Sequence, residues 1–136
     1  MRGVVVLSLL AFGSLLAACS SDSSKTAEDP NIVPKDYQGE LLLTLTNQLE
    51  DPTNIRDSGI TDPALRQAGR EQRYAVCVRY NARNGNRHYE GVKERIAYYY
   101  GGVLNQLVAA DQGQCKGAVY KPWPELEKYC MAKSCA

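Results

Sequence analysis

The sequence predicts an α+β fold: one main N-terminal helix packed on a three-stranded antiparallel meander, followed by a short C-terminal helix. Apolar residues recur at helical spacing between residues 34 and 50, and at alternate positions from residue 73 onward. Asn84-Gly85 and Gly101-Gly102 are typical of the two turns that such a meander needs. The 136 residues are 44% hydrophobic and 23% charged, as in globular domains, and the net charge of +1 argues against a nucleic-acid-binding protein.

Residues 1–18 are expected to be a signal peptide. Met1-Arg2 supplies a positive charge, and the apolar run at residues 4–18 is shorter than the roughly 20 residues that cross a bilayer. The run ends in Leu16-Ala17-Ala18-Cys19, which resembles the lipobox of bacterial lipoproteins. The resemblance implies cleavage before Cys19 and a covalent lipid on that residue, and no other cofactor is expected. An ordinary secretory signal with an incidental cysteine is the alternative.

The residues after Cys19 indicate where the lipidated chain would reside. Residue 20 is Ser rather than Asp, which in lipoproteins favours sorting to the outer membrane. We therefore expect the chain on the periplasmic face of the outer membrane, held there by its lipid. Residues 19–33 are rich in Ser, Asp, Lys and Pro and are expected to be a flexible tether. Residues 34–136 are then a single domain.

The main helix is expected to begin near Pro34 and to end before Pro52. Its apolar face consists of residues spaced three and four apart: Tyr37, Leu41, Leu42, Leu45 and Leu49. Asp62-Pro63 is typical of an N-cap followed by the first residue of a helix. It predicts a short helical turn that continues to about residue 68.

The strands of the meander are expected at residues 73–80, at about residues 89–100 and at residues 103–108. A strict two-residue loop between the first two strands would place Lys93 opposite Val76, on the face meant for the core. We therefore expect an odd-length loop or a bulge, which would place Val76 and Val78 on one face with Val92 and Ile96. The tail is expected to form a stiff turn that presents the only Trp, and then a short helix over residues 124–129.

Four cysteines remain after Cys19, and an even number in an oxidising compartment favours disulfides. They allow three pairings, of which we expect Cys77–Cys115, with Cys130–Cys135 as a local clip of the tail. A metal site is not expected, because no CxxC pair occurs and the single His stands alone.

Several segments resemble a family of small alphaproteobacterial outer-membrane lipoproteins. They are Leu49-Glu50-Asp51-Pro52 after the helix, the Cys-containing strand that ends in Asn81-Ala82-Arg83-Asn84, and Tyr89-Glu90-Gly91. The Ala-Tyr-Tyr-Tyr-Gly-Gly strand end and the Lys-Pro-Trp-Pro-Glu-Leu-Glu tail extend the likeness over nearly the whole mature chain. The resemblance implies an exported α+β protein and brings no catalytic residues.

The residues themselves also indicate no enzyme. His88 falls at a predicted hairpin tip, where a solvated His is the usual case. Glu90 and Glu94 are too far apart along a strand for direct contact, at about 3.3 Å per residue. A glycan hydrolase built on these carboxylates is the weaker alternative. No GxSxG, P-loop or HExxH motif occurs.

A basic cluster is the candidate interaction face. Between residues 66 and 95, eight basic residues stand against three acidic ones. The expected members lie on the first two strands: Arg73, Arg79, Arg83, Lys93, Arg95 and Tyr99. Arg can grip phosphate or carboxylate with two hydrogen bonds, and both Arg and Tyr are enriched at interfaces. A solvated sheet face that guards against edge pairing is the alternative.

Together these features predict a non-enzymatic, outer-membrane-anchored periplasmic lipoprotein that acts as an interaction or envelope-assembly module. We expect its partner to be an envelope protein, and we expect it not to bind nucleic acid. By size and layout it is similar to the small accessory lipoprotein of the barrel assembly machinery. The alternatives are an inhibitor of a lysozyme-type enzyme and a glycan-binding lipoprotein.

Overall fold

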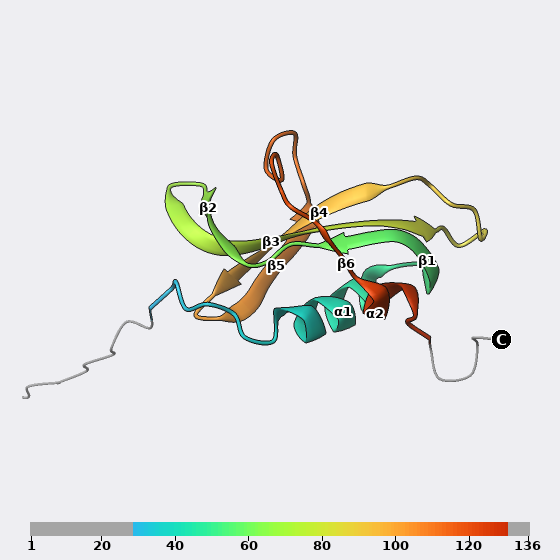
Figure 1. The fold of residues 1–136 in the computed structure, drawn as a ribbon, viewed down its shortest axis with the longest axis horizontal. Coiled ribbons are helices and arrows are strands. Elements are labelled where there is room, and N and C mark those ends of the chain that lie inside the picture. The colour runs from blue at the N-terminus through green and yellow to red at the C-terminus, as the bar shows by residue number, and fades with distance from the viewer. Residues whose placement is uncertain (1–28, 131–136) are drawn as a thin grey trace, which may run out of the picture.

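The structure is a computed structural model that describes residues 29–130. It consists mainly of a six-stranded antiparallel sheet, with one helix of 12 residues and a second of four (Figure 1). The elements are α1 (Tyr37–Gln48), β1 (Asp51–Ile60), β2 (Ala64–Ala68), β3 (Glu71–Arg83), β4 (Lys93–Tyr100), β5 (Val103–Ala109), β6 (Lys121–Pro122) and α2 (Pro124–Glu127). The predicted fold, a main helix on a three-stranded meander, is wrong. A β3-β4-β5 meander is present, but β1, β2 and β6 extend it to the order β5-β4-β3-β1-β6, with β2 also paired to β3.

The two strands that sequence reasoning missed, β1 and β2, form one interrupted edge along β3. β1 pairs with the C-terminal part of β3, and β2 pairs with its N-terminal part. Between them the backbone N–H of Thr61 donates to the Cys77 carbonyl at 3.0 Å, and the Thr61 hydroxyl accepts from the Cys77 N–H at 3.0 Å. Asp62-Pro63 is therefore the break between two strands rather than the start of a helix. Pro63 fits there because it has no N–H to leave unpaired.

β1 is hard to detect because its sequence does not alternate. Its register on β3 shifts twice, and Asn54 and Asp57 adopt φ of 54° and 52°. Asn and Asp enter this left-handed region more readily than other non-Gly residues. The bulges turn the strand, so polar and apolar residues along β1 do not alternate with a period of two.

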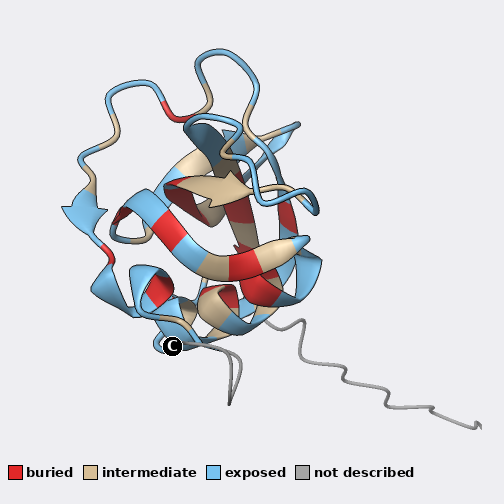
Figure 2. Ribbon diagram, turned by 90° about the vertical axis from the view of Figure 1, so that its right-hand side faces the viewer, coloured by how far each residue is buried: buried red, intermediate tan, exposed pale blue. Residues whose placement is uncertain are grey.

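One sheet face packs against both helices, and we call it the helix face. Its centre on β3 is Val76, Val78 and Tyr80, against which Leu41 and Leu45 of α1 are fully buried. Figure 2 shows the buried residues gathered on the strands and on the sides of the helices turned toward them. The apolar stripe predicted for the helix is thus the side of α1 that packs against the sheet. Trp123, which we expected to be presented at a turn, is instead buried in this core.

The opposite face is apolar at its centre as well, and we call it the loop face. Ala75 and Cys77 of β3 and Ile96 of β4 are buried there beneath residues 110–120, the segment that rises from the sheet on the side away from the helices (Figure 1). A disulfide joins Cys77 to Cys115, with the two Cα atoms 6.0 Å apart, so this predicted pairing is confirmed. Cys130 is disulfide-bonded too, but Cys135 lies outside the described residues. The Cys130–Cys135 pairing therefore stays a prediction.

The β3–β4 connection contains both an odd-length loop and an irregularity. A bridge between Arg83 and Tyr89 leaves five residues in the loop, but the ladder beyond it, which starts at Tyr80 opposite Lys93, is displaced by one residue. Val76 therefore faces Ala97 and Val78 faces Arg95, while Ile96 pairs with Cys77 on the loop face. The expectation that Val76 and Val78 share a face with Ile96 is wrong, because β4 has apolar residues on both faces.

Side chains occupy part of the outer edge of β5, the last strand on one side of the sheet. The Leu104 N–H donates to the Glu40 carboxylate of α1 at 3.0 Å, and Arg95 donates to the Leu107 carbonyl at 2.6 Å. At the adjacent β4–β5 turn, the Gly101 N–H donates to the Pro30 carbonyl at 3.2 Å. The part of the expected tether (residues 19–33) that the structure describes therefore lies against this turn.

The predicted signal peptide at residues 1–18 and the lipidation site Cys19 lie outside the described residues. Within residues 29–130, neither helix is long and apolar enough to span a bilayer.

Candidate functional site

The six residues predicted to form one interaction face lie on both faces of the sheet. Lys93 and Arg95 pair with Tyr80 and Val78 and so belong to the helix face, whereas Arg73 and Arg79 are on the loop face. Tyr99 is fully buried on the helix face, where its hydroxyl donates to the Tyr37 carbonyl at 3.3 Å; it cannot serve as an exposed contact. The predicted face is therefore corrected: its residues do not form one surface.

Like Tyr99, the charged side chains of this set are held by other groups of the protein, and Arg73 forms an ion pair with Glu71. Arg83 pairs with Asp51 at 2.8 Å, and Lys93 pairs with Glu90, which raises the pKa of Lys93. Arg95 donates to the edge of β5 as described above. Arg79 lies over the Tyr120 ring, 4.7 Å from its centroid.

Tyr120 in turn links Arg79 to Glu94. The Tyr120 hydroxyl donates to the Glu94 carboxylate, and burial together with that carboxylate raises the pKa of the Tyr120 phenol. The Arg79 end of the loop face is thus a set of groups that already satisfy one another.

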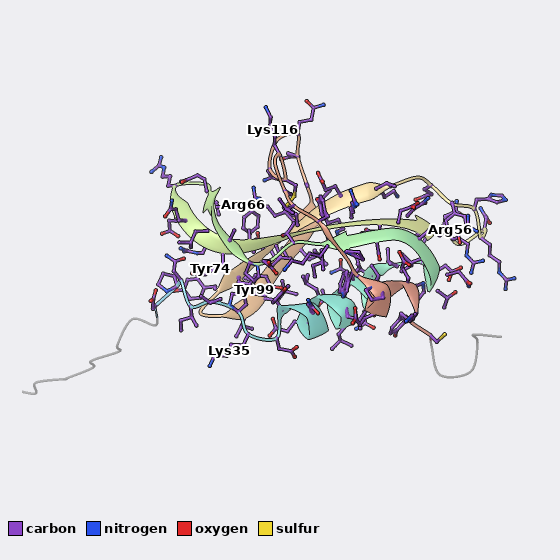
Figure 3. The ribbon with its side chains drawn as sticks, viewed as in Figure 1. Lys35, Arg56, Arg66, Tyr74, Tyr99 and Lys116 are labelled. Carbon is purple, nitrogen blue, oxygen red and sulfur yellow. A yellow bond between two sulfur atoms is a disulfide. The ribbon has the colours of Figure 1, made fainter. Side chains whose placement is uncertain are left out.

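A groove on the loop face is the most distinctive hollow of the described surface. It consists of two adjoining hollows of about 380 and 510 Å³ that share Tyr98 and Gln114. Both volumes fall in the range of small-ligand sites. We call it the Arg–Tyr groove and define it by six lining residues: Arg66, Arg73, Tyr98, Tyr100, Gln106 and Gln114. Figure 3 shows Arg66 on the same side of the sheet as Lys116 of the raised segment, and Tyr74 and Tyr99 on the helix side.

The groove has a floor of strand residues and two walls. Tyr98, Tyr100 and Gln106 of β4 and β5 form the floor, and the β2–β3 hairpin contributes Arg66 and Arg73 as one wall. The opposite wall is the segment that carries Gln114. A disulfide joins Cys115 to Cys77 of β3. The neighbouring residue Gln114, and with it this wall, is therefore held close to the sheet.

Hydrogen bonds join the two walls to the floor. Arg66 donates to the Gln114 carbonyl at 2.9 Å, and the Gln114 side-chain amide donates to the Tyr98 hydroxyl at 3.2 Å. Arg73 lies over the Tyr100 ring, 5.1 Å from its centroid, and forms an ion pair with Glu71. The groove is therefore formed before any ligand binds.

Arg66 and Arg73 lie directly opposite each other across the β2–β3 pair, and so on the same face. Like charges in this position destabilise a sheet by roughly 0.2–1 kcal/mol. Of the described residues that line the groove, none is Asp or Glu. Arg73 thus lines one hollow and Arg66 the other, and neither lining contains a carboxylate.

Sequence reasoning missed most of the groove. Arg66 falls in the predicted helical turn. The useful signal was the predicted Cys77–Cys115 bond, because it requires residues near 115 to lie over β3. Gln114 and the loop-face residues of β4 could have been placed from that constraint.

The residues considered for catalysis do not assemble into a site. Glu90 faces Lys93, whose hydrogen bond lowers the pKa of the Glu90 carboxyl, and Glu94 accepts from Tyr120. The His88 backbone N–H donates to Asn84 at the hairpin tip. Within residues 29–130, no three His, Cys, Asp or Glu side chains gather as a metal site would require.

Comparison of the chain with protein-family models, with curated proteins and with solved structures finds no match.

Proposed function

We propose that this chain is an outer-membrane-anchored periplasmic lipoprotein, a member of the alphaproteobacterial family that its motifs resemble, and that its folded domain is a non-enzymatic binding module of the cell envelope. The anchor is the lipid on Cys19 that the lipobox-like sequence implies. The binding surface is the Arg–Tyr groove. The single observation that supports a binding role is the pair of arginines, opposite each other across β2 and β3, that line the two hollows of this groove.

The disulfide supports an oxidising compartment. The Cys77–Cys115 bond is buried and connects the wall of the groove to the central strand, so the groove depends on it. Structural disulfides of this kind persist in the periplasm and are rare in the reducing cytosol. A groove that needs oxidation for its shape is consistent with export.

The chemistry of the lining supports binding rather than catalysis. Its polar side chains in the described chain are Arg, Tyr, Asn and Gln, none of which is an ordinary nucleophile or general base at neutral pH. These groups can orient and hold a ligand by hydrogen bonds, stacking and charge. We therefore assign the groove a recognition role.

Two measurements test the proposal. Metabolic labelling with a palmitate analogue is expected to label the wild-type chain and not the Cys19→Ser variant, and the variant is expected to leave the membrane fraction. A photo-cross-linking amino acid at Gln106, inside the groove, is expected to give a specific envelope adduct in cells. The same amino acid at Leu43, which is exposed on α1, is the matched control.

Each measurement has an outcome that contradicts part of the proposal. A wild-type chain without lipid label would rule out the anchor. Adducts of the same identity and yield from Gln106 and Leu43 would rule out the groove as the binding surface.

A further inference from the structure

We infer that the Arg–Tyr groove binds a carboxylate-bearing glycan. The inference rests on the proposed function, in which this groove is the binding surface, and goes beyond it by naming the class of ligand. Three properties of the groove lead to it: its two arginines without a carboxylate in the lining, its amide groups and its tyrosine floor.

The charge of the groove calls for an anion. Arg66 contacts the neutral carbonyl of Gln114, and it has no ion pair among residues 29–130. Arg73 has one acidic neighbour, Glu71, whose side chain is 65% exposed and lies outside the groove lining. A carboxylate bound beside these two arginines, which lie opposite each other across β2 and β3, would offset the repulsion across the strand pair.

The amides of the groove match sugar hydroxyl groups. Asn105, Gln106 and Gln112 line the two hollows, and their side chains make none of the hydrogen bonds found within residues 29–130. Each such amide has both donors and an acceptor, and a sugar hydroxyl likewise donates and accepts. A row of free amides next to two arginines therefore suits a ligand that combines many hydroxyls with an acidic group.

The tyrosines of the floor supply the apolar part of sugar recognition. Tyr98 and Tyr100 are two residues apart on one face of β4, which separates them by about 7 Å along the strand. The C–H face of a pyranose ring packs on an aromatic face, as other apolar groups do. Arg73 lies over the Tyr100 ring, 5.1 Å from its centroid, so Tyr98 is the floor tyrosine without a cation over its ring among the described residues.

A bound peptide fits the groove less well. Peptides that bind to sheets do so mostly by adding a strand to a free edge. The floor of the groove is the face of β4 and β5, where β4 is paired on both sides within the sheet. A peptide lying on this face would therefore find no free backbone groups of β4 with which to pair.

The test is co-sedimentation of the full chain, purified in detergent, with insoluble glycans. Peptidoglycan sacculi are aminosugar strands that carry carboxylates on their peptide stems and on lactyl groups without a peptide, and chitin is an aminosugar polymer without them. We expect binding to sacculi, weak or no binding to chitin, and weakening with added salt, because exposed charges are screened beyond about 8–10 Å at 0.1–0.15 M. Lipopolysaccharide as a soluble competitor distinguishes a second source of acidic sugar.

The decisive variant is Arg66→Gln/Arg73→Gln, which keeps amide hydrogen bonding and removes both charges. We expect it to weaken binding to sacculi about tenfold or more. Its melting temperature is measured alongside, because the variant removes a like-charge pair but also the Arg66–Gln114 hydrogen bond and the Arg73–Glu71 ion pair. The control Arg87→Gln/Lys128→Gln makes the same change in charge at two exposed positions outside the groove and is expected to bind as the wild type does.

Several outcomes would overturn the inference. They are equal binding to chitin and sacculi, unchanged binding by a folded Arg66→Gln/Arg73→Gln variant, and an absence of binding to every glycan tested. None of these bears on the palmitate label or on the cross-link at Gln106. A protein adduct at Gln106 without glycan binding would thus overturn the ligand class and leave the lipoprotein and its binding surface in place.

Discussion

The carboxylate of Glu127 accepts a hydrogen bond from the backbone N–H of Ser58 at 3.0 Å, across 69 positions of sequence. The Ser58 hydroxyl lies 3.0 Å from the same carboxylate oxygen and 2.8 Å from the Trp123 carbonyl, and it can donate to one of them at a time. These contacts attach α2 to β1. They hold the tail against the sheet so that Trp123 stays in the core.

The first prediction concerns this attachment. Glu127→Ala removes the acceptor from a part-buried N–H, and we expect it to lower the free energy of unfolding by about 1–2 kcal/mol. Glu127→Gln keeps an acceptor oxygen and is expected to lose less. Urea unfolding, followed by the fluorescence of the only Trp, measures both. Glu125→Ala on the exposed side of α2 is the control, and an equal loss there would argue against the attachment.

The second prediction concerns Trp123 itself. Its side chain is buried, and its indole N–H has no hydrogen-bond partner among the described residues. Trp123→Ala leaves a cavity, for which we expect a loss of about 3–5 kcal/mol. Trp123→Phe leaves a smaller cavity and also removes the unsatisfied donor, so it is expected to cost clearly less. Urea unfolding followed by far-UV circular dichroism compares the two. Equal losses would contradict a cost that depends on the size of the cavity.

The third prediction concerns the disulfide. The bond closes a loop with a sequence separation of 38, for which the chain-entropy relation gives a stabilisation of about 4 kcal/mol. We expect Cys77→Ala/Cys115→Ala to lose much of this stability. The variant is also expected to lose sacculus binding, because Gln114 is no longer held at the groove. Chemical unfolding and co-sedimentation measure the two effects. Retained binding at full strength would show that the wall of the groove forms without the bond.

The fourth prediction concerns acid stability. The Asp51 carboxylate accepts from the Thr53 hydroxyl at 2.6 Å and from the Thr53 N–H at 3.0 Å, and it pairs with Arg83 at 2.8 Å. The Thr53 hydrogen bond and the Arg83 charge lower the pKa of this carboxyl below its ordinary value of 3.8, although partial burial opposes them.

A carboxyl with a lowered folded-state pKa stabilises the fold above its unfolded pKa, and this stability is lost as the pH falls through the folded value. We therefore expect Asp51→Asn to cost on the order of 1 kcal/mol at pH 7, since the pair is partly exposed. The cost should shrink as the pH falls below about 4. Thermal melting from pH 7 to pH 2 compares the two proteins. A cost that does not change over this range would mean that the charge of Asp51 contributes nothing.

The segments that sequence reasoning placed well are those whose pattern reflects a single packed face. Leu41 and Leu45 recur at helical spacing because α1 has one buried side. β3 combines alternation with burial on both faces, since Val76 meets the helices and Cys77 meets residues 110–120. The assumption of one core face led to a wrong pairing for Ile96.

The groove could not be predicted because its residues come together only through contacts that are remote in sequence. Arg66 reaches Gln114 across 48 positions, and it lies in a segment whose Asp62-Pro63 signal favours a helix locally. Tertiary pairing with β3 overrides that local preference, as is common for short segments. Charge counting did point to residues 66–95, but it could not tell which arginines are held by their own neighbours.

The contacts on β5 affect whether copies of this chain can associate through the edges of their sheets. That strand ends the sheet, and Val103 and Val108 on it are exposed, a combination that invites growth of the sheet from one molecule into the next. Glu40 and Arg95 occupy an N–H and a carbonyl of the same strand. An incoming strand would have to displace two charged hydrogen bonds before it could continue the ladder. These two hydrogen bonds therefore oppose fibril-like association through β5.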